Sequence, residues 1–204
     1  MTDISTYEVL PPVLPAAEPD RPRLLIIGTA LTSAAAIAGF AALIGVYLAQ
    51  RAEVLATGET WLPSGVHIPL TQPNFMAVTL VMAALAMTWA VYAGHNHDRA
   101  NTLIAVGLTL LFGFAYISQT MFLLTIMNLP VATSGVQGWL IWAIVSSHVA
   151  MAGAAMGFSA LMGLRTVGGQ LSPQDREGLL GAAVFWYVTV GVYLVIWYAI
   201  YITK

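Results

Sequence analysis

Residues 178–202 read GLLGAAVFWYVTVGVYLVIWYAIYI, a stretch without a single charged side chain. A helix rises about 1.5 Å per residue, so about 20 apolar residues cross the roughly 30 Å of a bilayer's hydrocarbon core. The alternation of apolar and polar residues that marks a strand of an outer-membrane barrel is absent. The stretch therefore predicts a transmembrane helix.

Four more apolar stretches precede it and have similar lengths, which predicts five spans in one membrane domain at residues 24–204. Residues 1–23 are polar and rich in proline and predict a disordered or extended tail. Span four is longer than a bilayer requires, which predicts tilt. The predicted spans are 24–50, 74–93, 103–127, 136–164 and 178–202.

Composition supports an all-α, polytopic transmembrane bundle. Of the 204 residues, 59% are hydrophobic and only 8% are charged, against about 25% charged residues in soluble domains. This excludes a soluble globular domain and a disordered chain. The net charge of −2 argues against a nucleic-acid partner, and the absence of cysteine excludes disulfides and thiolate metal sites.

Charged residues in the connections predict the orientation. By the positive-inside rule, the side with more arginines is cytoplasmic, which places the N-terminus inside and the C-terminus outside. Aromatic residues at the predicted outer ends of spans four and five agree: Trp139, Trp142, Trp197, Tyr198 and Tyr201. The inner connections carry Arg21, Arg23, Arg99, Arg165 and Arg176, and the outer side carries Arg51 and Lys204.

The predicted membrane interior has one ionisable residue, His148, and no carboxylate or lysine. A haem held by two histidines, a retinal Schiff base and a carboxylate proton path each need groups that this interior lacks. We expect neutral His148 to bond a neighbouring helix through a serine or Gln119. Gln119 itself is expected to make an interhelical hydrogen bond. No catalytic residue and no metal ligand set is predicted.

Three connections carry further signals. In the turn from His95 to Arg99, the favoured functional interpretation is a lipid-phosphate rim with Arg99 as main donor and His97 assisting. A solvated turn that sets topology stays open, and a metal site is the weakest alternative. The outer connection 51–73 is expected to fold over the surface. Ser172, Pro173 and Asp175 predict the capped start of span five.

Gly153 and Gly157 form a GxxxG pair in span four. Small residues at this spacing let two helix backbones approach closely. Packing within the chain is the favoured interpretation, and a contact between subunits is the alternative.

An ordered set of motifs resembles subunit III of the haem–copper cytochrome c and quinol oxidases. The set covers the chain from Leu24 onward and matches the short, five-span bacterial form. It departs from the family at a buried acid (Ala36), a first histidine (Val145) and a second acid (Phe122). The motifs are 68–74 (IPLTQPN), 87–90 (MTWA), 95–99 (HNHDR), 110–113 (LLFG) with Gln119, 147–149 (SHV) and 185–187 (FWY).

The resemblance implies an accessory, non-redox subunit in the aerobic respiratory chain of a bacterial cell membrane. Haem and copper would belong to its partners, subunits I and II, and the complex would reduce oxygen to water while translocating protons. This chain would stabilise subunit I and hold phospholipid, with Trp89, Arg99, Gln119, His148 and Trp186 as packing or lipid contacts. The departures weaken a role in proton uptake. Alternatives are an accessory subunit of a nitric oxide reductase and a small transporter or channel.

Overall fold

A computed structural model describes residues 23–129, 135–170 and 177–203 of the chain. All regular structure in these residues is helical, and five helices are long and apolar enough to cross a membrane. The predicted tail and the predicted cap at Ser172, Pro173 and Asp175 lie outside the described residues, as does Lys204. The helices are α1 (Leu24–Ala56), α2 (Thr71–His95), α3 (Arg99–Ile126), α4 (Gly135–Val167) and α5 (Glu177–Ile196), which a π-helical turn, η1 (Trp197–Ile202), continues.

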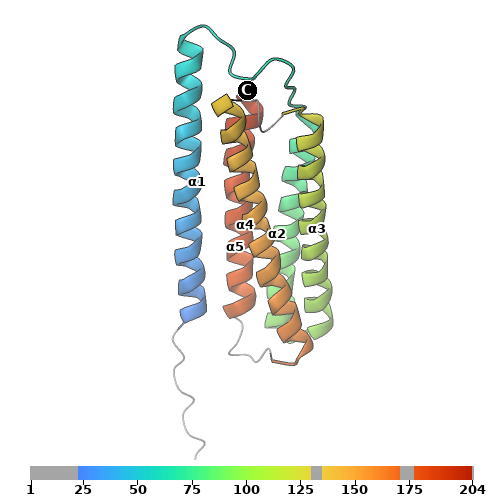
Figure 1. The fold of residues 1–204 in the computed structure, drawn as a ribbon. Coiled ribbons are helices and arrows are strands. Elements are labelled where there is room, and N and C mark those ends of the chain that lie inside the picture. Colours follow the sequence, from blue (N-terminus) through green and yellow to red (C-terminus); the bar gives the residue numbers. More distant parts are fainter. Residues whose placement is uncertain (1–22, 130–134, 171–176, 204) are drawn as a thin grey trace, which may run out of the picture.

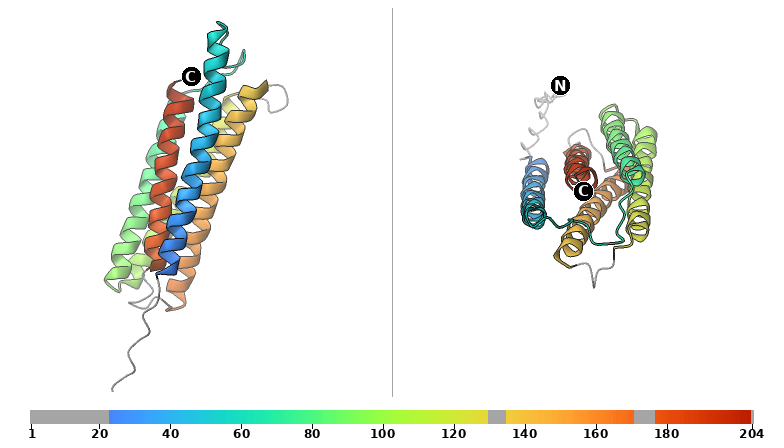
Figure 2. Two further views of the ribbon diagram at one scale, coloured as in Figure 1. Left: turned by 90° about the vertical axis from the view of Figure 1, so that its left-hand side faces the viewer. Right: turned by 90° about the horizontal axis from the view of Figure 1, so that it is seen from above.

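The helices run up and down in sequence order, so the described start and end of the chain lie at opposite ends of the bundle (Figure 1). We call the two ends the Arg99 end, where α1, α3 and α5 begin, and the Trp61 end, where α2 and α4 begin. Helix α5 packs against α1, α2 and α4, while α3 packs against α2 and α4. Viewed along the bundle, α5 lies in the middle and α1 at the edge (Figure 2).

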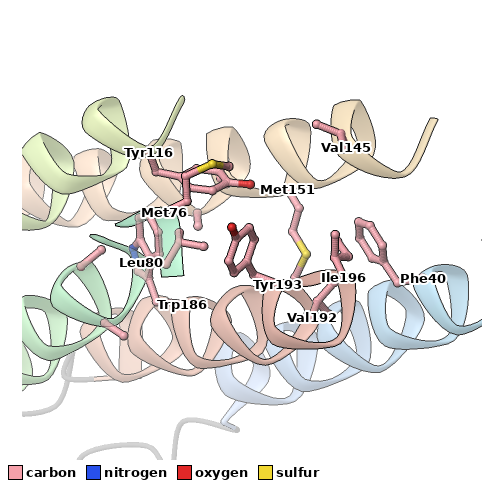
Figure 3. Packing of buried hydrophobic residues seen from close by; sticks show 14 of the residues in the cluster. Phe40, Met76, Leu80, Tyr116, Val145, Met151, Trp186, Val192, Tyr193 and Ile196 are labelled. Atoms are coloured by element: carbon pink, nitrogen blue, oxygen red, sulfur yellow. The ribbon is translucent and has the colours of Figure 1, made fainter. Parts of the chain in front are cut away.

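Burial follows this arrangement. In the most apolar stretch of each helix, 56% of residues are buried in α5 and only 17% in α1. Helices that are apolar on all sides bury one face against their neighbours and present the other to lipid. Tyr116, Trp186 and Tyr193 lie in the core, together with methionine and aliphatic side chains from α2 and α4 (Figure 3).

Helices α2 and α3 begin three and four residues before their predicted starts, at Thr71 and Arg99. Helices α1 and α4 continue past their predicted ends for a local reason. Helix α1 continues from Gln50 to Ala56, because the first residue with a left-handed backbone is Gly58 (φ 82°). Helix α4 ends in a Schellman motif, in which the N–H of Gln170 donates to the carbonyl of Arg165 and Gly169 has φ 69°. Glycine supplies this left-handed residue without steric cost.

The connection after α1 crosses the Trp61 end toward α2 and α3 (Figure 1). Trp61 is buried and its Nε1 donates to the Tyr47 hydroxyl at 2.9 Å. The N–H of His67 donates to the Met127 carbonyl, which ties the connection to the end of α3. Arg51 donates to the carbonyl of Thr203 at the end of the chain's last turn. The connection therefore covers the helix ends themselves.

One aromatic residue departs from the predicted outer belt. Trp139 and Tyr198 are exposed, and Trp142 and Trp197 are half-buried with their indole N–H groups bonded. Tyr201, however, is buried within the bundle. The π-helical turn changes the angular register of the last residues, so Tyr201 does not face the interface as predicted.

Candidate functional site

The middle of the bundle holds a histidine that joins three helices. His148 on α4 is 1% exposed. Its Nε2 lies 2.9 Å from the carbonyl oxygen of Thr189 on α5, and its Nδ1 lies 2.6 Å from the hydroxyl of Tyr116 on α3. A carbonyl oxygen can only accept, so Nε2 carries the proton and the Tyr116 hydroxyl donates to Nδ1. Both ring nitrogens are thus engaged, and neither has a free lone pair to offer a metal or haem iron.

Aromatic rings surround this imidazole. The ring centroids of Phe40, Tyr116 and Tyr193 lie 5.9, 5.5 and 5.6 Å from that of His148. Tyr116 and Tyr193 point into the centre of the bundle (Figure 3), and the Tyr193 hydroxyl donates to the carbonyl of Pro73 on α2 at 2.8 Å. The prediction that His148 bonds a serine or Gln119 is wrong. Tyr116 precedes Gln119 by three residues and reaches the imidazole instead.

The other motif residues also tie helices together. Gln119 on α3 donates from Nε2 to the Thr79 hydroxyl on α2 at 3.0 Å. Trp186 on α5 is fully buried and donates from Nε1 to the Ser159 hydroxyl on α4 at 2.8 Å. Each bond satisfies a polar group that would be costly to leave unpaired in a membrane interior. The polar motif residues Gln119, His148 and Trp186 thus act as interhelical connectors.

The turn at the Arg99 end is built from the residues of the HNHDR motif. His97 has a left-handed backbone (φ 60°), and the N–H of Asp98 donates to the carbonyl of Ala93. This is the Schellman pattern with histidine in the place that glycine usually takes. The Asp98 carboxylate then caps α3 by accepting from the N–H of Asn101 at 3.0 Å.

Arg99 reaches from α3 to α4, where it donates to the carbonyl of Val167 in the last turn. A guanidinium has five N–H donors, so this bond leaves others for a phosphate. Arg23 and Arg165 lie at the same end of the bundle. Trp89, which is 39% exposed, lies about 9 Å further along α2 from His95. His97 and Arg99 thus share one turn, and Trp89 lies deeper. Among the described residues, no three metal-binding side chains meet.

The GxxxG pair, Gly153 and Gly157, does not pack against another helix of the chain. A side chain added at Gly153 or Gly157 would meet nothing within 4 Å, and both residues are exposed. In the described part of the chain, the close approaches are at other glycines. At Gly113 an added Cβ would lie 2.7 Å from Met156 and 3.3 Å from Trp186. The prediction of packing within the chain is therefore wrong, because α4 turns this face away from its neighbours.

The Asp98 cap gives a pH-dependent expectation. The backbone N–H and side-chain amide of Asn101 hold the pKa of the Asp98 carboxyl below its usual value. The ionised cap therefore stabilises the fold above the unfolded-state pKa, and this contribution is lost as pH falls through the lower folded-state pKa. Asp98→Ala should lower the thermal midpoint in detergent at neutral pH, with a difference that shrinks in acid.

Asp98→Asn is the matched control, because asparagine caps a helix about as well as aspartate but does not titrate in this range. This variant should match the parent at neutral pH and lose less stability in acid. An acid dependence identical to that of the parent chain would contradict the assignment of the cap.

Several of these partners carry no signal in the sequence. Tyr116, Thr189 and Tyr193 lie inside apolar stretches and do not stand out from their neighbours. Their association with His148 depends on which faces of three separate helices meet, which composition does not specify. The motif at 147–149 identified the histidine, and only the packing of the helices identified its hydrogen-bond partners.

Fold and site define the class as a multi-pass helical membrane protein with a hydrogen-bonded core. No protein-family model matches the chain, and no curated protein matches it.

Proposed function

We propose that the chain is an accessory, non-redox subunit of the subunit III type in a haem–copper terminal oxidase of a bacterial cell membrane. The observation that carries the proposal is the role of the motif residues. Gln119, His148 and Trp186, which support the resemblance, all serve as interhelical connectors, and His148 offers no free nitrogen to a metal. Side chains that tie helices together in this way favour a structural subunit, one that stabilises a neighbouring subunit in which the cofactors are bound.

The complex as a whole would reduce oxygen to water with electrons from cytochrome c or quinol, on the haem and copper of subunits I and II. This chain would contribute a rigid apolar surface that stabilises subunit I in the bilayer. A nitric oxide reductase as host enzyme would make the same demands on the chain, and the metals of the co-purifying subunit distinguish the two hosts.

The direct test is purification of the tagged chain from membranes of its native host in mild detergent. A haem-bearing membrane subunit should accompany the chain at constant ratio, and the chain alone should carry no haem after dissociation. A stable, haem-free homo-oligomer would contradict the proposal. A flux assay with the purified chain in liposomes tests the transporter alternative, and the proposed accessory subunit should be silent there.

Lipid holding is the second part of the proposed function. Apolar grooves of about 530 and 330 Å³ run along α1 where it faces α4 and α5. The second groove begins at Leu24 and Leu25, beside Arg23 at the Arg99 end. Arg23 beside the groove and the apolar walls below it match the phosphate and acyl chains of a phospholipid.

Arg99→Gln should reduce retention of anionic phospholipid by several-fold in the purified chain, measured by native mass spectrometry. The variant removes the positive charge together with the bond that the guanidinium makes to the Val167 carbonyl. Arg51→Gln, at the opposite end, is the control and should retain the lipid. Equal losses in both variants would remove Arg99 from this role.

A further inference from the structure

A pair of hydroxyl groups lies on the outside of the seam between α2 and α5. The hydroxyls of Thr88 and Tyr187 are 2.6 Å apart, and Tyr187 is 46% exposed. Thr88 precedes the end of α2 by seven residues, and Tyr187 follows the start of α5 by ten. At about 1.5 Å per residue, both lie roughly 10 to 15 Å from the Arg99 end, which is inside the hydrocarbon core.

The direction of the hydrogen bond between the two hydroxyls follows from the single proton that each hydroxyl carries. The Thr88 hydroxyl donates its one proton to the carbonyl of Ala84 at 2.8 Å. It can therefore only accept from Tyr187, whose own proton is used in that bond. The Tyr187 oxygen keeps an acceptor lone pair, and within the described residues no N–H or O–H group reaches it. The Tyr187 hydroxyl can therefore accept a hydrogen bond from a donor outside the chain.

A second polar pair lies on the same seam near the Trp61 end. The indole Nε1 of Trp197 donates to Asn74 Oδ1 at 2.8 Å. The amide nitrogen of Asn74, on an exposed side chain, finds no acceptor among the residues that the structure covers. The seam therefore presents an acceptor at Tyr187 and a donor at Asn74. Between and beside them, Leu180 and Leu194 lie seven residues from Tyr187 on the same stripe of α5 and are exposed.

Two occupants fail to match this pattern. An acyl chain has no donor to offer the Tyr187 oxygen. A second copy related by a two-fold axis along the membrane normal keeps every residue at its own depth, so its exposed Asn74 donor stays near the Trp61 end, away from Tyr187. An axis that passes beside Tyr187 would bring Tyr187 against Tyr187. In each copy the Tyr187 proton is already used in the bond to Thr88, so two Tyr187 oxygens would face each other with no proton between them.

We infer that the α2–α5 seam docks a transmembrane helix of a different membrane subunit, which donates an O–H or N–H group to Tyr187 and accepts from Asn74. The inference deepens the proposed function and depends on it for the identity of the partner as the haem-bearing subunit. Interhelical hydrogen bonds of this kind, flanked by apolar side chains, give a membrane interface its register.

The chain contains no cysteine, so single thiols can be placed without background. Leu194→Cys marks the seam, and Leu111→Cys marks an exposed position on α3, outside the two helices that form the seam. Each variant is labelled in native membranes with benzophenone maleimide and irradiated. We expect Leu194→Cys to give an adduct with one defined second membrane protein through an apolar helical segment, and Leu111→Cys to give none.

Tyr187→Phe tests the hydrogen bond itself. This variant removes the acceptor and keeps the ring, and we expect retention of the partner after detergent extraction to fall several-fold. Tyr198→Phe, which alters a tyrosine near the Trp61 end that is 61% exposed, should retain the partner. Unchanged retention in Tyr187→Phe, adducts of Leu194→Cys with lipid or with a second copy only, or equal adducts from Leu111→Cys would overturn the inference.

The two proposals fail in different ways. If the cross-linked partner carries no haem, the oxidase function is wrong while the seam remains a docking face. If a haem-bearing subunit co-purifies but cross-links only through α3, the function stands and the docking face is wrong.

Discussion

Trp186→Ala should reduce the free energy of unfolding by about 3–5 kcal/mol, the range found for large aromatic residues cut back to alanine in a core. Trp186 is fully buried, and its ring lies against Gly113 while its indole N–H bonds Ser159. The substitution leaves a cavity between α3, α4 and α5 and removes the donor to the Ser159 hydroxyl. The measurement is reversible denaturation in mixed micelles, followed by circular dichroism.

Two controls separate burial from hydrogen bonding. Trp186→Phe keeps most of the apolar volume and loses the N–H, so its loss of stability should be clearly smaller. Trp139→Ala removes an indole that is 58% exposed and should change the free energy of unfolding little. Similar losses for Trp139→Ala and Trp186→Ala would show that the packing around Trp186 is misassigned.

His148→Ala should have the second-largest effect. Without the imidazole, the buried Tyr116 hydroxyl loses its acceptor, and leaving such a group unpaired costs about 1–3 kcal/mol before any cavity is counted. The variant also breaks the link that holds α3 and α5 to α4. We expect a lower free energy of unfolding and faster hydrogen exchange in the middle of these helices.

A double-mutant cycle with Tyr116→Phe isolates the bond between the two side chains. Because the phenylalanine removes the stranded hydroxyl, the double variant should be less destabilised than the sum of the single variants, with a coupling of about 1 kcal/mol or more. In a co-purified complex, the haem absorption per partner subunit should stay unchanged in His148→Ala. Additive effects, or loss of haem from a complex that stays assembled, would contradict a purely connecting role.

The five helices were predictable from sequence because each is defined by length and by the absence of charge, which are local properties. The residues at which the helices begin and end were harder to predict. Helix α1 continues beyond Gln50, since a helix stops where the backbone turns and not where hydropathy falls. The outward position of Gly153 and Gly157 could not be foreseen, because small residues suit packing within a chain and between chains equally well.

The candidate site was predictable only in part. His148 stands out as the lone ionisable residue of the membrane interior, but its partners lie on other helices and look like ordinary apolar-span residues. Thr88 and Tyr187 lie within the motifs at 87–90 and 185–187, but nothing in the sequence pairs them, since each residue type is common in membrane helices. What distinguishes the pair is its exposure and the direction of its hydrogen bonds, which only three-dimensional packing provides.

The most direct test of the scaffold role is the absorption spectrum of the tagged chain purified from its native membranes, before and after separation of the subunits. We predict a reduced-minus-oxidised haem spectrum in the intact complex and none in the separated chain, with the haem remaining on the partner. Haem that stays with this chain after separation, or a homogeneous chain that is free of haem and partners from the start, would contradict the account.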